Sequence, residues 1–178
     1  EKVSVVVHPK DESLAKKYLS SACELIPIEI NDAWIRDSGP TFVVDEGELA
    51  AVDWVFNGWG AQGWANFDKD ALLAQEIAKL TGAKLLASEL VNEGGGIHVS
   101  GSGKVLLTET VQLGKGRNPH LTKAEVEKEI HDKLGTSEAI WLKRGLTRDY
   151  DEFGTQGHVD IVACFAPDGR VLYHDQKN

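Results

Sequence analysis

The sequence has no methionine, only two cysteines, and no apolar run long enough to cross a membrane as a helix. Cys23 and Cys164 are too few for a disulfide framework and lack the spacing of a metal site, which favours a reducing compartment. The first residues also lack the basic and apolar regions of a signal peptide. These absences together predict a cytoplasmic protein.

Positive charge is scarce as well, because 19 Lys and Arg residues stand against 28 Asp and Glu residues, for a net charge of −9. This excess argues against nucleic acids and anionic membranes as partners. It is compatible with a small cationic substrate, although it is also typical of acidic proteins that are simply soluble. A homo-oligomer is compatible with the same composition.

A length of 178 residues and an apolar fraction of 42% are typical of one globular domain with a hydrophobic core. We therefore expect residues 1–178 to form a single domain. Because the chain has no initiator methionine and stops just after an expected strand, we also expect it to be part of a longer protein.

The order of the expected elements recurs along the chain. A helix, a strand, a polar loop and a hairpin follow one another three times, with a period of roughly 60 residues. This pattern predicts an α/β fold built from repeated units. The expected helices are 11–22, 68–82 and 122–135, the single strands are 3–7 (buried), 25–30, 83–88 and 139–142, and the hairpins are 41–56, 97–111 and 159–174.

The loop between strand and hairpin carries unusual residues in each unit, namely "WIRDSGP", "NEGGG" and "FGTQGHVD". If the units are related by rotation about an axis, these loops converge on that axis. Asp37, Glu93, His158 and Asp160 would then meet in one pocket. His158 and Asp160 are two positions apart on a segment expected to be extended, so their side chains should point to the same face.

Three carboxylates and an imidazole permit two kinds of chemistry. They could hold a metal ion, because Asp, Glu and His are common ligands. Alternatively, they could hold an organic cation, because a planar guanidinium offers donors on two edges that fit paired carboxylates. A metallohydrolase and a guanidinium-binding site therefore both remain open from the residues alone.

Four stretches, "NDAWIRDSGPTFVV", "NEGGGIHV", "RNPHLTKAEVE" and "GTQGHVDIVACF", closely resemble the agmatine deiminases. The resemblance covers nearly the whole chain, with the motifs in the same order. It implies a pentein fold of five ββαβ units around a pseudo-fivefold axis, of which about three are present, as a partial α/β-propeller. It also implies hydrolysis of agmatine to N-carbamoylputrescine and ammonia, a step of polyamine biosynthesis, by a cysteine nucleophile without metal or organic cofactor.

The resemblance also implies roles for individual residues. Asp37 and Asp160 are similar to the carboxylates that bind the guanidinium, and His158 to the group that protonates departing ammonia and then activates water. Glu93 is similar to the partner that holds and charges His158. Trp34, Asp32 and Arg36 share the first motif and are expected to shape the substrate pocket or to anchor its loop.

The expected nucleophile is missing from the chain, because no Gly-rich motif ending in cysteine is present. Cys164 lies within the apolar run "IVACF" and Cys23 ends an expected helix, so both are predicted to pack as small apolar residues. We therefore predict that this chain alone is inactive. The stretch "KGRNPH" is expected to be a surface loop with an exposed Arg117 that needs no function, and Trp59 is expected mainly to pack.

Two further functions remain open besides agmatine hydrolysis and the metallohydrolase. A bacterial-type peptidylarginine deiminase would share the fold and motifs but act on C-terminal arginines of peptides. A non-catalytic module that binds guanidinium or polyamines would explain a chain without a nucleophile.

Overall fold

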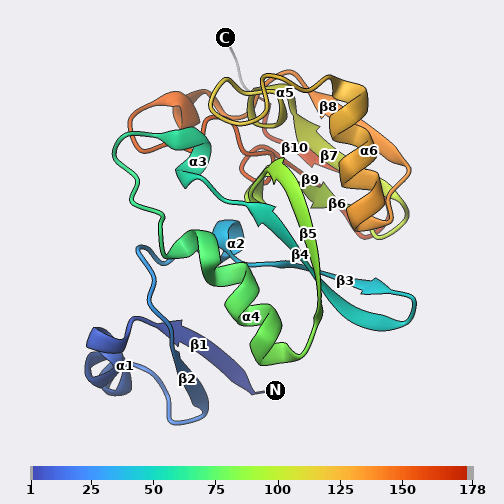
Figure 1. Cartoon of the computed structure of the whole chain (residues 1–178). Helices are drawn as coiled ribbons and strands as arrows, with labels where there is room; N and C mark the ends of the chain where they lie inside the picture. The colour runs from blue at the N-terminus through green and yellow to red at the C-terminus, as the bar shows by residue number, and fades with distance from the viewer. Residues whose placement is uncertain (1, 176–178) are drawn as a thin grey trace.

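The structure, a computed structural model, describes residues 2–175 and has a mixed α/β fold (Figure 1). The strands are β1 (Val3–Val7), β2 (Cys23–Pro27), β3 (Thr41–Asp45), β4 (Glu48–Val55), β5 (Lys84–Val91), β6 (His98–Val99), β7 (Lys104–Thr108), β8 (Glu138–Leu142), β9 (Ala163–Phe165) and β10 (Val171–Tyr173). The helices are α1 (Glu12–Tyr18), α2 (Ile35–Ser38), α3 (Gly58–Ala61), α4 (Leu73–Thr81), α5 (Glu109–Gln112) and α6 (Lys123–Leu134). Four short 3-10 helices are η1 (Pro9–Asp11), η2 (Asp70–Leu72), η3 (Gly94–Gly96) and η4 (Thr147–Tyr150).

Two three-stranded sheets share one topology. In the first, β3 and β4 form an antiparallel hairpin and β5 adds to β4 in parallel after α4. In the second, β6 and β7 form the hairpin and β8 adds to β7 in parallel after α6. Each sheet is thus a β-β-α-β unit, in which a hairpin joins the helix and strand that follow it.

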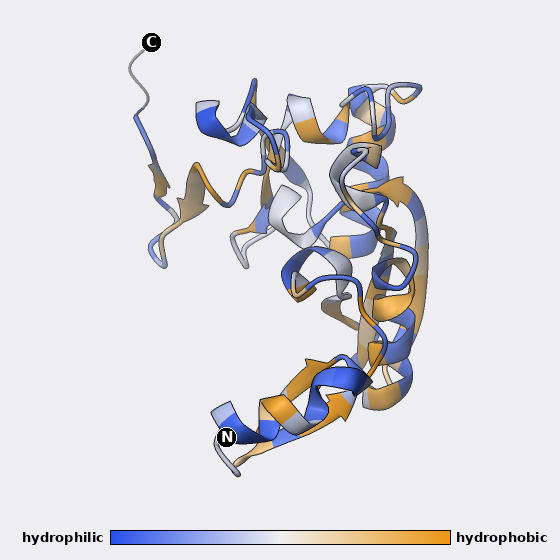
Figure 2. Cartoon of the chain, turned by 90° about the vertical axis from the view of Figure 1, so that its left-hand side faces the viewer, coloured by the Kyte–Doolittle hydropathy of each residue, from blue (hydrophilic) through white to orange (hydrophobic). Residues whose placement is uncertain are grey.

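The two ends of the described chain carry smaller sheets. The strands β1 and β2, which are connected through α1, pair in parallel. The strands β9 and β10 pair as an antiparallel hairpin. Figure 2 shows the four sheets following one another along an open arc, with the β1–β2 pair near one end and the β9–β10 hairpin near the other. The polar connections between sheets are the loops that bear the predicted site residues.

Alternating residues of β7 divide the main core in two. Val105 and Leu107 pack with residues of β4, β5 and α6, whereas Leu106 packs with Val159, Val162 and other residues at the C-terminal end. All three β7 side chains are completely buried. Because β7 packs on both of its faces, its position is well determined, and so are the positions of the loops at its ends.

Local signals in the sequence explain several element boundaries. The capping box of Thr122 and Glu125 begins α6, and Gly135 ends it in a left-handed conformation. Gly82 ends α4 in the same conformation. The turn of the β3–β4 hairpin lies at Glu46 and Gly47, as the sequence predicts.

Three expectations about local structure were wrong. Strand β1 is largely unburied, with Val3 55% exposed, because β1 pairs with only one neighbouring strand and α1 has no buried residue. The loop expected at residues 31–40 contains α2. Residues 158–162 are not extended but turn, with the Val162 and Ala163 amides donating to the Val159 carbonyl, so strand β9 begins only at Ala163.

Among residues 2–175, no helix combines the length and the apolar character that a membrane span requires.

Candidate functional site

The three inter-sheet loops meet at the backbone of Gly95. The Gly95 amide donates to Oδ1 of Asp37 at 3.0 Å, and the amide of Asp160 donates to the Gly95 carbonyl at 3.2 Å. Asp37 comes from α2, Gly95 from η3, and Asp160 from the turn that precedes β9. The structure therefore brings together segments separated by more than 50 positions in the sequence.

His158 lies among three carboxylates at this junction. Its Nε2 is 3.4 Å from Oε2 of Glu93, and its Nδ1 is 3.8 Å from Oδ1 of Asp37 and 4.0 Å from Oδ1 of Asp160. His158 and Glu93 are almost completely buried, whereas the Asp160 side chain is 37% exposed. The imidazole thus separates one carboxylate on its Nε2 side from two on its Nδ1 side.

Asp37 is held rigidly by two donors. Its Oδ1 accepts from the Gly95 amide, and its Oδ2 accepts from the indole Nε1 of Trp59 at 2.9 Å. Trp59 is a buried residue of α3 with a left-handed backbone, at φ 59° and ψ 43°. Such a conformation is unfavourable for a bulky residue and must be maintained by its surroundings. From the sequence, Trp59 is expected mainly to pack, within a Gly- and Trp-rich stretch that could line a pocket rim; its contact with Asp37 was not predicted.

Gly95 is required by the closeness of the two loops. A Cβ at this position would lie 2.4 Å from Nδ1 of His158 and 2.8 Å from Oδ1 of Asp37. Any side chain would therefore separate the two groups or displace them. The triple glycine in "NEGGG" is a local signal for this close approach.

Another buried carboxylate, Asp149 of η4, organises the loop that carries His158. Its oxygens accept from the amide of Thr155 at 2.7 Å, the Thr155 hydroxyl at 2.6 Å, the Gly157 amide at 2.6 Å and the His158 amide at 3.1 Å. No sequence motif marks Asp149. Its role depends on the path of the loop, which no local motif reveals.

Arg117 corrects the expectation of an exposed loop residue. It is only 6% exposed, and its Nε lies 3.0 Å from both carboxylate oxygens of Glu93. The expectation failed because a polar sequence with a glycine and a proline resembles a surface loop, whereas here it folds inward and buries the charge of Arg117. Arg117 and Glu93 form a buried ion pair behind His158.

The charges around His158 shift its pKa and that of Glu93. Burial alone lowers the pKa of His158, but the hydrogen bond and charge of Glu93, together with Asp37, outweigh burial and raise it above the ordinary value. Burial alone raises the pKa of Glu93, but the charge of Arg117 and the contact with His158 lower it below the ordinary value. The geometry therefore favours an imidazolium beside an ionised Glu93.

Asp160 behaves differently from Glu93. Burial raises its pKa, and the nearby charge of Asp37 adds to this rise, while His158 and Arg36 oppose it. Asp37 and Asp160 thus repel each other across the Nδ1 side of His158. A cation placed between them would relieve this repulsion.

The remaining residues of the first motif lie outside this buried cluster. Trp34, Asp32 and Arg36 are all exposed. The Asp32 amide is anchored by the carboxylate of Asp70, which also accepts from the Asn31 amide. Arg36 lines a cavity that also includes Asp160. The substrate-binding roles of these three residues stay predictions.

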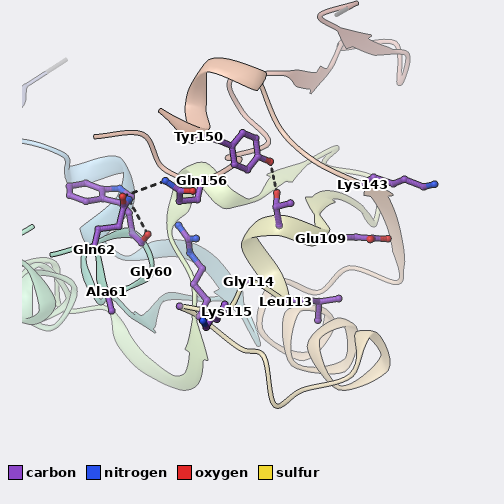
Figure 3. A pocket seen from close by; sticks show the side chains of 14 residues that line it. Gly60, Ala61, Gln62, Glu109, Leu113, Gly114, Lys115, Lys143, Tyr150 and Gln156 are labelled. Atoms are coloured by element: carbon purple, nitrogen blue, oxygen red, sulfur yellow. Dashed lines mark hydrogen bonds between the residues drawn. The ribbon is translucent and has the colours of Figure 1, made fainter. Parts of the chain in front are cut away.

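Two cavities adjoin the site. The larger, about 710 Å³, is lined by Trp59, Arg117 and Tyr150 among others and contains none of the four candidate residues. Figure 3 shows Gln62 and Gln156 on one side of it and Glu109 and Lys143 on the other. The smaller cavity, about 440 Å³, includes Asp160, Arg36 and Gly94. We assign the candidate site to the smaller one, because a candidate carboxylate faces it.

A metal site does not match this arrangement. Within residues 2–175, no group of three or more His, Cys, Asp or Glu side chains is placed to hold a metal ion. The oxygens of Asp37 and Glu93 instead accept from Trp59, a backbone amide and Arg117. Hydrogen bonds from such donors are typical of an ionised carboxylate that orients a neighbouring group or favours its protonated form.

Comparison with known proteins identifies the family. A model of the Porphyromonas-type peptidyl-arginine deiminase family matches residues 1–178. The chain belongs to this family. A Streptomyces coelicolor protein with the provisional name agmatine deiminase is 57% identical over 100% of this chain and 53% of its own length. The agmatine deiminase of Medicago truncatula is 39% identical over 97% of this chain and 48% of its own length.

Solved structures of the family have the same fold. The agmatine deiminase of Enterococcus faecalis matches 96% of this chain and 47% of its own, with a TM-score of 0.88 and 38% identity. A substrate-bound Cys→Ser variant of C. jejuni agmatine deiminase matches 97% of this chain and 50% of its own, with a TM-score of 0.84 and 27% identity. This family member therefore spans about half the length of the relatives it matches.

Proposed function

We propose that the whole protein hydrolyses the guanidinium group of agmatine, giving N-carbamoylputrescine and ammonia for polyamine synthesis. The observation that carries this proposal is the position of His158 between Glu93 on one side and Asp37 and Asp160 on the other. A guanidinium bound by the two aspartates lies on the Nδ1 side of His158. The names of the relatives support agmatine as the substrate.

In the proposed reaction, Asp37 and Asp160 hold the guanidinium on two edges and fix its central carbon. A carboxylate oxygen can accept more than one hydrogen bond, so Asp37 can bind substrate while it keeps its contacts to Gly95 and Trp59. This orientation removes much of the entropic cost of attack on the carbon.

A cysteine thiolate outside this chain then attacks the guanidinium carbon. His158, protonated beside Glu93, gives its proton to the departing nitrogen, so that ammonia leaves and a covalent amidino-thioether remains. Neutral His158 next takes a proton from water, and the resulting hydroxide attacks the same carbon. The carbon–sulfur bond breaks as the added hydroxyl group loses its proton to solvent, where the released ammonia takes it up as ammonium; the urea product leaves and the thiolate is regenerated. A Cys→Ser variant of the C. jejuni relative that retains its substrate supports a cysteine in this role.

The same proposal extends to the architecture. We place residues 1–178 in one catalytic domain, a partial pentein propeller, in which the β-β-α-β sheets surround the candidate site. The rest of the protein would close the arc and supply the nucleophile. The site would need no metal and no organic cofactor for this chemistry.

Peptidyl-arginine hydrolysis is the second candidate, because the family model carries the name of peptidyl-arginine deiminases. Both activities convert a guanidinium to a urea, so one colorimetric assay for ureido product separates them by substrate. Purified full-length protein is incubated with agmatine or with a peptide ending in arginine. We expect product from agmatine; product from the peptide alone would reject agmatine in favour of the second candidate, and product from neither would favour a binding module.

Variants of the full-length protein test the site. Asp160→Asn should lower kcat/KM, with a rise of about 2–5 kcal/mol in activation free energy, the range for removing one partner of a charge pair that becomes buried when substrate binds. Asp168→Asn is the matched control, because Asp168 bonds only to Arg170 among the contacts recorded for its side chain. Equal activity of Asp160→Asn and Asp168→Asn would show that Asp160 does not bind substrate.

A further inference from the structure

Arg117, which forms a buried ion pair with Glu93, lies outside the predicted catalytic set. Nε of Arg117 lies 3.0 Å from both Oε1 and Oε2 of Glu93. The two side chains are 2% and 0% exposed, whereas a surface pair such as Lys84 and Asp45 is 53% and 35% exposed. A fully buried guanidinium is costly unless it is paired and hydrogen-bonded, so its placement requires an explanation.

Arg117 also contacts the loop that carries His158. Its Nη2 donates to the Thr155 carbonyl at 2.8 Å, and the Thr155 hydroxyl accepts from the His158 amide at 3.3 Å. One guanidinium therefore bonds both to Glu93 and to the segment that precedes His158. Arg117 therefore connects Glu93 to the loop that carries His158.

The backbone is built to bring Arg117 inward. The preceding residue, Gly116, passes so close to α3 that a Cβ there would lie 2.0 Å from the Gly60 carbonyl oxygen. The Arg117 amide donates to the Gly114 carbonyl at 2.8 Å, which closes the turn. The side chain of Asn57 donates to the Gly116 carbonyl at 2.9 Å and joins this turn to α3.

We propose that Arg117 is a positioning residue, which fixes Glu93 against His158 and keeps Glu93 ionised whether His158 is protonated or neutral. This inference rests on the proposed function, in which His158 first donates and then accepts a proton. When His158 is neutral, Glu93 would be an isolated buried carboxylate without Arg117. That cost would hold the proton on His158, and so hinder both its donation to the departing nitrogen and its later action as a base.

Every charged group that faces His158 enters this balance. Glu93 and Asp37 favour the imidazolium, and Arg117 opposes it. Asp160 lies 4.0 Å from Nδ1, and Asp149 accepts from the His158 amide. Because Arg117 is the positive member of this group, its removal should raise the pKa of His158. A general loss of local structure should do the reverse, since it would weaken the contact with Glu93 that raises the pKa.

The sign of the change is therefore diagnostic, and NMR titration measures it without any assay of turnover. Full-length protein is labelled with 15N-histidine, and His158 is assigned by comparison with His158→Gln. The titration compares wild type with Arg117→Met, Arg117→Lys and Val126→Ala. Val126 is a buried core residue of α6 and reports the effect of destabilisation alone.

We expect a raised pKa of His158 in Arg117→Met, and values close to wild type in Arg117→Lys and Val126→Ala. An unchanged or lowered pKa in folded Arg117→Met would overturn the proposal. If Arg117→Met does not fold, Glu93→Gln is compared with the double variant Glu93→Gln/Arg117→Met. The double variant removes both members of the ion pair, so neither charge is left buried without its partner. The double variant must then show a higher pKa of His158 than Glu93→Gln alone, and equal values would reject the role of Arg117.

Turnover provides a second readout. In full-length protein that is active on agmatine, Arg117→Met should lower kcat by about 100-fold, within the range that general acid–base catalysis contributes. KM should change little, because Arg117 does not face the smaller cavity. Arg117→Lys should restore part of kcat, whereas wild-type kcat in Arg117→Met would contradict the inference. If the wild type is inactive on agmatine, the proposed function fails and the titration alone decides.

Discussion

At the scale of single residues, the site is defined by close approaches that leave no spare volume. Asp37 and His158 approach each other closely because Gly95 has no side chain, and Arg117 lies against Glu93. The function of each group depends on its neighbours, because burial and charge act on His158 and Glu93 in opposite directions. Small changes at this scale should therefore have large effects.

Gly95→Ala should disrupt the site, because the new methyl group would lie 2.4 Å from Nδ1 of His158. We expect a loss of about 1–3 kcal/mol in the free energy of unfolding, typical of an inserted methyl group in a packed region, and loss of agmatine turnover in the full-length protein. Urea unfolding and the ureido assay measure the two effects. Gly63→Ala is the control, since a Cβ at Gly63 meets nothing within 4 Å. Comparable values for both variants would contradict the close approach at Gly95.

His158 should make stability depend on pH in a predictable direction. Its pKa in the folded protein is raised above the ordinary value of 6.5, so the folded state binds the proton more tightly than the unfolded chain. The resulting stabilisation is complete below about pH 6.5 and is lost as the pH rises through the folded pKa. Urea unfolding of wild type and His158→Gln between about pH 5 and 9 measures it. The difference in stability should shrink as the pH rises, and a difference that grows would contradict the raised pKa.

At the scale of elements, the short helices rather than the long ones build the site. The one-turn helix α2 presents Asp37, η3 brings Gly95 to it, and η4 supplies Asp149. Long helix α6 serves the core instead, with Val126 and Ile130 completely buried against neighbouring strands. This division explains why strong helical patterns in the sequence reveal the scaffold and not the chemistry.

Asp149→Asn tests the element that holds the His158 loop. An amide oxygen can replace only part of the carboxylate, which accepts from Thr155, Gly157 and His158. We expect a loss of about 1–3 kcal/mol in the free energy of unfolding, the cost of buried donors left unpaired. Hydrogen exchange at the Gly157 and His158 amides should accelerate. Asp151→Asn is the control, because Asp151 is exposed and pairs only with Arg148 among the ion pairs recorded for the described residues. Unchanged exchange in Asp149→Asn would show that the loop is held by other contacts.

At the scale of the whole molecule, the candidate site lies where several sheets meet and not within any one of them. The chain spans about half the length of its relatives, and large apolar side chains of β3 and β10, such as Val44 and Tyr173, are exposed. The candidate catalytic groups of this chain include an acid–base residue and carboxylates but no cysteine. The proposed reaction therefore needs a cysteine from a part of the protein beyond this chain.

The chain by itself should not hydrolyse agmatine, whereas the full-length protein should. Cys164 cannot substitute, because it lies on β9 in register with Leu172 of β10, beyond the turn that contains His158 and Asp160. Cys164→Ser in the full-length protein should retain activity within a few-fold of wild type. The ureido assay measures both, and product from the isolated chain that disappears in Cys164→Ser would identify Cys164 as the nucleophile after all.

The sequence by itself determined the features that depend on neighbouring residues. The capping box at Thr122, the stop at Gly135 and the turn at Glu46 and Gly47 follow from local conformational preferences. The recurring order of elements and the polar loops between them were also readable, and that order suggested that distant loops converge.

Only the tertiary structure decided how those loops are held together. The burial of Arg117 against Glu93, the bond from Trp59 to Asp37 and the contacts of Asp149 join residues that no local pattern links. The turn at residues 158–162 likewise replaced an expected strand, because the loop bonds to itself and to Gly95 rather than to a neighbouring strand. Burial and long-range electrostatics are properties of the assembled chain, so a polar sequence such as "KGRNPH" does not reveal whether its charge faces water or the core.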